Sequence, residues 1–233
     1  MRPDKPLGHK SYGTIGHLPG SRQGRDDVGI GPGQARICLE KARDRHDRII
    51  VQEKLDGTNV AVANVGGQVI PLIRAGYPAV SSHYEQHRLF AVWVFERLDL
   101  FAFLKPGERL AGEWLAQAHG TRYQLRHDPF VAFDIMRNGH ERAPFDEFVE
   151  RIAGKLTTPT MLHTGGPCAI AAVMAMLGEF GFHGALDPVE GAVWRVERQG
   201  RIDFLAKYVR PDKIDGCYLP ELSGGEPIWN WRP

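Results

Sequence analysis

The chain has little cysteine, no long hydrophobic run and almost no net charge. Its three cysteines, Cys38, Cys168 and Cys217, lie far apart without C-x-x-C spacing. This argues against a disulfide framework or a zinc knuckle and fits a reducing compartment. No apolar stretch reaches membrane-spanning length, and residues 1–10 lack the apolar segment of a secretory signal. We therefore expect a cytoplasmic protein with no membrane partner.

Charge is unevenly distributed, although the formal net charge is only +1 and gives no global argument for a nucleic-acid partner. Residues 1–33 are rich in Gly and Pro, and we expect loops there. Five basic side chains in residues 1–25 face one acidic side chain, Asp4; they are Arg2, Lys5, Lys10, Arg22 and Arg25. Such a segment is typical of phosphate contacts and equally of a solvated basic arm.

Hydrophobic patterning indicates an α+β fold built from hairpins and intervening helices, rather than a doubly wound parallel sheet. Gly66-Gly67 separates two β-like runs, which predicts a hairpin with Val65 opposite Gln68. Pro71 within the second run indicates an edge strand or a bulge. Two further strands are expected over 109–116 and 130–136, the second followed by an Asn138-Gly139 turn. Helices are expected over 34–47, 82–104, 144–156 and 168–180, with Ser82 and Glu85 at capping-box spacing in the second.

A second hairpin is predicted over residues 190–209, turning at Gln199-Gly200. A two-residue loop there places Ala192 opposite Lys207. Glu190 then lies diagonally across the ladder from Lys207, roughly 7–8 Å away and within side-chain reach. A carboxylate and an ammonium so placed form either a surface salt bridge or a clamp for a metal and a phosphate.

The stretch "IIVQEKLDGTNVAV", residues 49–62, places Lys54 between an apolar run and an Asp-Gly turn. An amine is a nucleophile only when deprotonated, and neighbouring cations, a metal or desolvation would lower its pKa from about 10.4. Asp56 could orient metal-bound water, and Gly57 would allow the backbone to approach a nucleotide. K-x-D-G alone is a weak signal, and a solvated loop lysine is the alternative.

Four motifs in order make the pattern specific. "EKLDGT", "LAGEWLAQAHGTRYQL" followed by "FVAFDIM", "VEGAVWR" and "LAKYVRPD" together cover roughly residues 50–212. They resemble the motifs of the covalent nucleotidyltransferase superfamily of ATP-dependent ligases and capping enzymes, and within it the RNA ligases. "GHLPGSR" is also similar to segments that precede the nucleophile in this group.

The resemblance implies ATP as cofactor, with Mg²⁺ or Mn²⁺, and Lys54 as the nucleophile that carries AMP. The implied partners of Lys54 are Glu53 at the adenine, Gly57 beside the nucleotide, Arg74 at the ribose or 5′-phosphate, Glu113 at the ribose hydroxyl, Phe133 stacked on the purine, Asp56 and Glu190 at the metal, and Lys207 at the α-phosphate. The closing motif has one lysine where relatives often have two, and whether Arg210 replaces the second stays open.

The implied fold is one adenylyltransferase domain over residues 1–233, related to the ATP-grasp arrangement. It has two antiparallel sheets, flanking helices and a nucleotide cleft between the sheets. Residues 1–33 would form its basic N-terminal segment, and no separate C-terminal domain is expected. The leading hypothesis is an RNA ligase that adenylates a 5′-phosphate and seals it to a 3′-hydroxyl. The alternatives are a DNA-nick ligase, an adenylyltransferase subunit that needs a partner protein, and a non-catalytic binder of nucleic-acid ends.

Overall fold

The computed structural model describes residues 4–137 and 139–233. Arg2, in the basic segment, and Asn138, in a predicted turn, therefore lie outside the described residues. The chain divides into two compact units, each with its own sheet. Unit 1 comprises the residues up to Gly13, Thr58–Gln117 and Asp128–Thr158, and unit 2 comprises Thr14–Gly57, Ala118–His127 and Pro159–Pro233.

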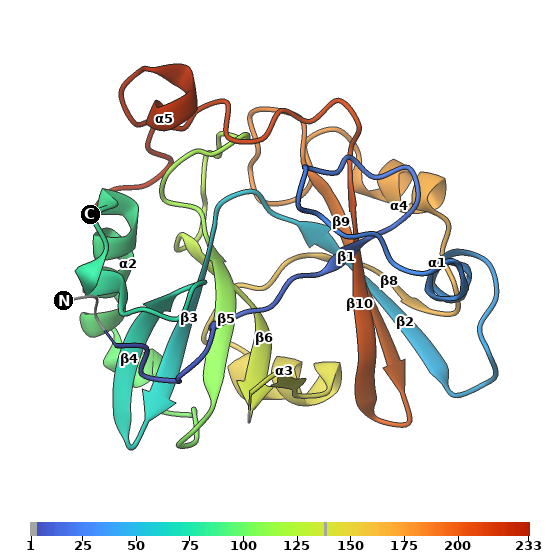
Figure 1. Cartoon of the computed structure of the whole chain (residues 1–233), viewed down its shortest axis with the longest axis horizontal. Helices are drawn as coiled ribbons and strands as arrows, with labels where there is room; N and C mark the ends of the chain where they lie inside the picture. Colours follow the sequence, from blue (N-terminus) through green and yellow to red (C-terminus); the bar gives the residue numbers. More distant parts are fainter. Residues whose placement is uncertain (1–3, 138) are drawn as a thin grey trace. The chain divides into compact units, whose positions relative to one another are not determined.

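Unit 2 is built on a five-stranded sheet, which we call sheet A. Its strands, in spatial order, are β1 (Gly16–His17), β10 (Arg201–Val209), β9 (Gly191–Arg198), β2 (Asp47–Lys54) and β8 (Met161–Gly165). Figure 1 shows β2, β9 and β10 as long neighbouring arrows. All pairs are antiparallel except that of β1 with β10, which is parallel. Neither β1 nor β8 is among the predicted strands.

One face of sheet A packs against α1 (Pro32–Leu39) and α4 (Ile170–Leu177). Alternate residues of the strands point to this face, since successive side chains in a strand alternate. The resulting core contains Ile49, Val51, Trp194 and Val196, with Cys38 of α1 and Val173 of α4. The opposite face of sheet A carries the other set of alternate residues, and the candidate site lies there.

Unit 1 is built on a second five-stranded sheet, sheet B, which is antiparallel throughout. Its strands, in spatial order, are β4 (Gln68–Ile73), β3 (Thr58–Val65), β5 (Arg109–Trp114), β6 (Phe130–Arg137) and β7 (Glu141–Arg142). The helices of this unit are η1 (Ala79–Ser81), α2 (Glu85–Phe95), η2 (Leu98–Phe101) and α3 (Phe145–Ile152). Its core is an aromatic cluster of Phe90, Trp93, Phe101, Trp114 and Phe130.

The Gly66-Gly67 hairpin has the predicted register, with Val65 opposite Gln68. Pro71 lies in β4, which is an edge strand and has a neighbouring strand on one side only. Proline has no N–H to donate and is tolerated in such a strand. Strand β5 falls within the predicted range 109–116, and β6 extends one residue beyond the predicted range 130–136, to Arg137. The α+β prediction with two sheets is confirmed.

The predicted helices form, but they are shorter than expected. α1 ends at Leu39, and Glu40 at its C-cap leaves the helical backbone conformation, with φ −127° and ψ −53°. The capping box at Ser82 is wrong: Tyr84 is the N-cap of α2, and the Ser82 hydroxyl accepts the Tyr84 N–H. The last helix of the chain is α5 (Pro220–Ser223). Among the described residues, no helix is long and apolar enough to cross a bilayer.

The β9–β10 hairpin turns at Gln199-Gly200 as predicted, with Arg198 opposite Arg201, but its far end is shifted by one residue. Asp203 is an extra residue in β10, a β-bulge between Ile202 and Phe204. Lys207 therefore lies opposite Val193 and not Ala192, so the predicted register there is wrong.

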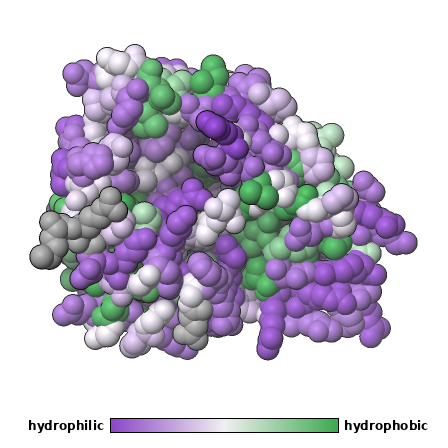
Figure 2. Space-filling view, in the orientation of Figure 1, coloured by the Kyte–Doolittle hydropathy of each residue, from purple (hydrophilic) through white to green (hydrophobic). Residues whose placement is uncertain are grey.

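Ion pairs hold this bulge in place. Arg43 donates to Asp203 at 2.6 Å and to Asp47 at 2.8 Å, which links the bulge to the start of β2. Arg198 also contacts Asp47, at 3.0 Å. The surface over this end of the hairpin, at the lower right of Figure 2, is accordingly hydrophilic. A charged network thus stabilises an irregularity that the hydrophobic pattern of the strand does not reveal.

Candidate active site

The ends of three neighbouring strands lie side by side at one end of sheet A. β2 and β10 are both antiparallel to β9, so they end where β9 begins. Lys54, the last residue of β2, lies opposite Gly191, and Gly191 lies opposite Val209. Three segments far apart in the sequence therefore place their polar residues together.

The bulge at Asp203 decides which face Lys207 points to. In the observed register Lys207 is two residues before Val209, in the same pleat set as Lys54. In the regular register it would align with Ala192 and point into the core beneath α1 and α4. A one-residue shift reverses the face of a strand residue, and here the shift brings both lysines onto one face.

Glu190 reaches the same face because of the glycine that follows it. Gly191 has φ +154°, and a Cβ at this position would lie 1.9 Å from the Tyr208 carbonyl oxygen. Only glycine fits so close to the neighbouring strand. Glu190 directly precedes β9 and is not part of the strand. Its carboxylate accepts a hydrogen bond of 2.6 Å from Lys54 Nζ.

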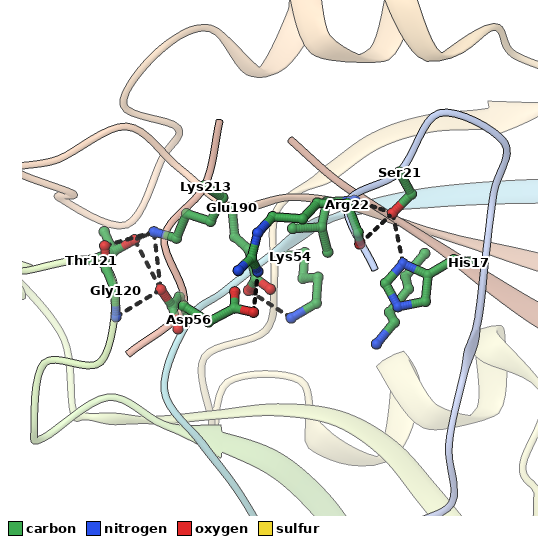
Figure 3. Close-up of polar contacts among 12 residues, drawn as sticks. His17, Ser21, Arg22, Lys54, Asp56, Gly120, Thr121, Glu190 and Lys213 are labelled. Atoms are coloured by element: carbon green, nitrogen blue, oxygen red, sulfur yellow. Dashed lines mark hydrogen bonds and ion pairs between the residues drawn. The ribbon is translucent and has the colours of Figure 1, made fainter. Parts of the chain in front are cut away.

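Figure 3 shows this Lys54–Glu190 pair at the centre of a row of polar contacts. Burial raises the pKa of Glu190, against the opposing charge of Lys54. Burial and then the charge of Lys54 lower the pKa of Lys207, whose Nζ lies 3.5 Å from Asp27 Oδ1. The charge of Lys54 therefore acts on the ionisation of both Glu190 and Lys207.

Asp56 is held by a cation that the sequence reasoning missed, Lys213. Lys213 Nζ lies 3.0 Å from Asp56 Oδ2 and donates to the carbonyl of Gly120 at 2.7 Å and to the hydroxyl of Thr121. The backbone N–H of Gly120 donates to the same Asp56 oxygen at 3.0 Å. An ammonium has three protons, and these three acceptors match them, so Lys213 and Asp56 form a fixed pair.

The candidate metal ligands are two carboxylates, Asp56 and Glu190. The charge of Asp56 raises the pKa of Glu190, which shows that the two groups interact. No cluster of three or more His, Cys, Asp or Glu residues is found in the described parts of the chain. Two hard oxygen donors fit a Mg²⁺-like ion that keeps several waters and takes further ligands from phosphate.

Glu53 points away from Lys54, into the other face of sheet A. It shares a row with Ala192 on the core side, and it is 2 % exposed. The backbone N–H of Phe182 donates to its carboxylate at 3.2 Å, and His183 Nε2 lies 3.9 Å away. Burial raises the pKa of the Glu53 carboxyl to about 7. A contact of Glu53 with adenine, by side chain or backbone, stays a prediction.

The raised pKa of Glu53 predicts a pH-dependent cost to stability. Because the folded pKa of about 7 exceeds the ordinary 4.5, folding favours the protonated form. The free energy of unfolding should fall as the pH rises from about 4.5 to 7, by up to about 3 kcal/mol. Glu53→Gln cannot ionise and should remove this decline. Urea unfolding at pH 5 and pH 8 measures the difference, with exposed Glu40→Gln as the control. An equal decline in both variants would contradict the assignment.

The other predicted site residues, Arg74, Glu113 and Phe133, belong to unit 1. Arg74 follows β4, is exposed, and donates to the carbonyl of Gly13 at 3.3 Å. Glu113 is half-buried in β5 opposite Asn59. Their roles at the ribose and the 5′-phosphate stay predictions.

Phe133 is the extra residue of a β-bulge in β6, and such bulges re-aim side chains. Its half-buried ring packs edge-on against Tyr12 at 5.1 Å between centroids. Tyr12 in turn donates from its hydroxyl to Asp134 at 2.6 Å. Tyr12 therefore fixes the Phe133 ring, which is predicted to stack on the purine. The sequence did not reveal this contact between Tyr12 and Phe133.

Whether Arg210 replaces the second lysine of the closing motif stays open. Arg210 donates to Asp212 at 2.7 Å, a pair within one exposed turn. Lys213, six residues beyond Lys207, is the second closing-segment cation that reaches the Asp56–Glu190 pair, since it lowers the pKa of Glu190. The spacing in "AKYVRPDK" does not match a two-lysine motif, which is why it was missed.

Residues 47–209, more than two thirds of the chain, match the RNA ligase family. Among solved structures, an archaeal ATP-dependent RNA ligase has a TM-score of 0.50 at 21% identity, covering 70% of this chain and 42% of its own. A Naegleria gruberi RNA ligase variant with ATP and Mn has a TM-score of 0.54 at 14% identity, covering 84% and 59%. A putative ATP-dependent DNA ligase from Aquifex aeolicus has a TM-score of 0.53 at 17% identity, covering 85% and 49%.

These likenesses show a shared ligase fold, and this chain spans less than two thirds of each of the three proteins. No curated protein sequence matches the chain. The family match contains the strand end with Lys54, the Glu190-Gly191 step and the bulged strand with Lys207. The chain belongs to the RNA ligase family.

Proposed function

We propose that this chain is an ATP-dependent RNA ligase that forms a covalent lysyl-AMP on Lys54. The observation that carries the proposal is the Lys54–Glu190 hydrogen bond of 2.6 Å, at a strand end that Lys207 shares on the same face. A nucleophilic lysine needs a partner to take its proton and a cation to stabilise negative charge on phosphate. This end of sheet A contains both.

In the first step, Lys54 Nζ attacks the α-phosphorus of ATP. The N–P bond forms, the bond between the α-phosphorus and its bridging oxygen breaks, and pyrophosphate leaves. Glu190 is placed to accept the Lys54 proton, because it already accepts that hydrogen bond and burial raises its pKa. Lys207 stabilises the charge that develops on the α-phosphate oxygens.

Asp56 and Glu190 would hold the divalent metal, consistent with the Mn present in the Naegleria gruberi ligase structure. A bound divalent ion would neutralise phosphate charge in the reaction. Lys213 orients the Asp56 carboxylate, because it contacts one of the two oxygens at 3.0 Å.

Two further transfers complete the proposed reaction. An oxygen of the RNA 5′-phosphate attacks the lysyl-AMP phosphorus, which releases Lys54 and forms a 5′,5′-pyrophosphate link. The 3′-hydroxyl then attacks the RNA phosphorus, giving a phosphodiester and free AMP, and its proton passes to water. The predicted roles of Arg74, Glu113 and Phe133 belong to the binding of the nucleotide and the 5′-phosphate.

A DNA-nick ligase is the second candidate, because the Aquifex aeolicus structure with the same fold is described as a putative DNA ligase. A requirement for a partner protein is the third candidate, and this chain spans less than two thirds of the length of the ligase structures it matches. We propose that the protein works in the cytoplasm and binds nucleic-acid ends. Its three free cysteine thiols are consistent with a reducing compartment. A single adenylyltransferase domain over residues 1–233 stays a prediction.

The test is incubation with ATP labelled at the α-phosphate and a divalent metal. We expect a covalent protein label that is labile in acid and stable in alkali. A second assay offers the labelled protein matched nicks with ribose or deoxyribose at the 3′-hydroxyl side. Sealing that requires ribose supports RNA ligation, and equal sealing supports the DNA-nick ligase. Absence of label with both Mg²⁺ and Mn²⁺ would contradict the proposed chemistry.

Deleting Asp203 tests the bulge directly. Removal of the extra residue restores the regular register of β10, which turns Lys207 toward the core side. We expect the rate of lysyl-AMP formation to fall about 100-fold, as for other misplaced catalytic groups. Asp203→Ala keeps the extra residue but loses the ion pair with Arg43, so it measures the part of the effect that comes from the ion pair alone. Circular dichroism checks the fold, and full activity of the folded deletion variant would refute the role of the bulge.

A further inference from the structure

The segment Gly16–Asp27 contains the edge strand β1 of sheet A and is held to that sheet beyond it, so it is not a loose basic arm. His17 pairs with Lys207 in the parallel β1–β10 ladder, and the Leu18 N–H donates to the Lys207 carbonyl at 2.8 Å. The Arg22 N–H donates to the Val209 carbonyl at 2.9 Å. Leu18 is fully buried in the core of unit 2. His17, Leu18 and Arg22 of the predicted basic segment are thus fixed against the strand that carries Lys207.

Arg22 extends from this segment toward the Lys54–Glu190 pair, as Figure 3 shows. Its guanidinium bonds to the carboxylate of Asp215, whose side chain is 61% exposed. An ion pair with so exposed a partner contributes little. Arg22 can therefore exchange this carboxylate for another anion at small cost, and a guanidinium binds phosphate with paired hydrogen bonds.

Lys207 is paired in the same way on the other side of this segment. Asp27 Oδ1 lies 3.5 Å from Lys207 Nζ, and Asp27 Oδ2 lies 3.2 Å from His17 Nε2. The His17 ring is 2% exposed and its Nδ1 bonds to the Ser21 hydroxyl at 2.7 Å, so its position is fixed. The Asp27 side chain is 32% exposed and lies on a loop beyond β1. Each of two cations near Lys54 thus holds an accessible carboxylate.

We propose that Arg22, with Lys207, forms a binding subsite for a phosphate group in which the carboxylates of Asp215 and Asp27 occupy the positions of phosphate oxygens until the ligand binds. The proposal deepens the proposed ligase function and rests on it for the source of the phosphate. That source is either the β,γ-phosphates of ATP or the 5′-phosphate of the polynucleotide. No bond is made or broken at this subsite.

Binding of inorganic pyrophosphate, measured by titration calorimetry without nucleotide, tests the subsite independently of catalysis. Arg22→Gln should weaken binding about 10-fold or more, as for the loss of a charged hydrogen-bond donor. Arg25→Gln, in the same segment and exposed, is the matched control for charge and should change binding less than 2-fold. Equal effects of the two changes would overturn the proposal, since they would show a general charge effect only.

Asp27→Asn supplies a test of the opposite sign. Removal of the competing carboxylate should tighten pyrophosphate binding about 3- to 10-fold, because Lys207 no longer has to exchange partners. Neighbouring Asp26→Asn, exposed and identical in net charge, should have less than half of this effect. Weaker binding in Asp27→Asn would show that Asp27 organises the lysine instead of standing in for phosphate, and would overturn this part of the proposal.

Two kinetic arms identify the source of the phosphate. A rise in the KM for ATP of Arg22→Gln during lysyl-AMP formation assigns the subsite to the β,γ-phosphates. Normal lysyl-AMP formation with slow transfer to a 5′-phosphorylated RNA assigns it to the 5′-phosphate. If both steps are normal while the wild type is active, the subsite is refuted and the ligase function stands. If the wild type forms no lysyl-AMP, the ligase function fails, and the calorimetry still decides the subsite.

Discussion

Lys54→Arg is expected to abolish covalent AMP labelling while the protein stays folded. The loss of a catalytic nucleophile typically lowers the rate by a factor on the order of 10⁶. A guanidinium stays protonated at all ordinary pH values and cannot attack phosphorus. It still carries the charge that pairs with Glu190, so the ion pair at the end of β2 is retained. Gel autoradiography with α-labelled ATP measures the label.

The choice of arginine separates chemistry from stability. Lys54→Ala would leave the buried Glu190 without its 2.6 Å partner, and an unpaired buried charge destabilises a fold. Lys41→Arg, at an exposed lysine, is the matched control and should label as the wild type does. Label on the folded Lys54→Arg protein would mean that another residue carries AMP, and peptide mapping would locate it.

Lys207→Met should slow lysyl-AMP formation by about 10²- to 10³-fold, the cost usually seen when one group that stabilises transition-state charge is removed. Methionine approximates the length and volume of lysine without its charge. Asp27 and His17 would remain paired with each other at 3.2 Å, so the change should disturb β10 little. Single-turnover labelling at saturating ATP isolates this step from nucleotide binding.

Arg210→Gln is the control for Lys207→Met, because it removes another positive charge close to the end of β10. Arg210 follows the same strand, but its guanidinium is engaged with exposed Asp212. We expect its labelling rate to remain within about 2-fold of the wild type, because an exposed pair of this kind contributes little. A large loss in Arg210→Gln with a small loss in Lys207→Met would reverse the assignment of the closing cation.

The local patterns of the sequence predicted the elements around the site well. Alternating residues and Gly-Gly or Gln-Gly turns located both hairpins, because these signals act over a few residues. The K-x-D-G stretch placed Lys54 at a strand end, where β2 does end. The boundaries of α1 and α2 were less accurate: α1 leaves the helical conformation at Glu40, and the Ser82 hydroxyl accepts the N–H of Tyr84, the N-cap of α2.

The sequence missed β1, β8 and the irregularities that shape the site. Strand β1 has two residues, too few for any periodicity, and it forms because the β10 backbone offers it partners. Strand β8 is short and largely exposed, with no clean alternation. Lys213 reaches Asp56 only because the chain turns after Arg210. The sequence spacing between Lys213 and Lys207 does not predict this contact.

The amino-acid sequence by itself determined the family, the two-sheet α+β class and the identity of the lysine at the strand end, because these depend on motifs and short-range patterns. The resemblance named Glu190 and Lys207 as partners of that lysine, and only the tertiary structure decided how their side chains reach it. The bulge at Asp203, held by Arg43 from another segment, puts Lys207 on the face of Lys54. The backbone at Gly191, pressed against Tyr208 of the next strand, brings Glu190 to within 2.6 Å of Lys54. A one-residue register shift and a close backbone contact are set by packing between distant segments, and no local pattern encodes them.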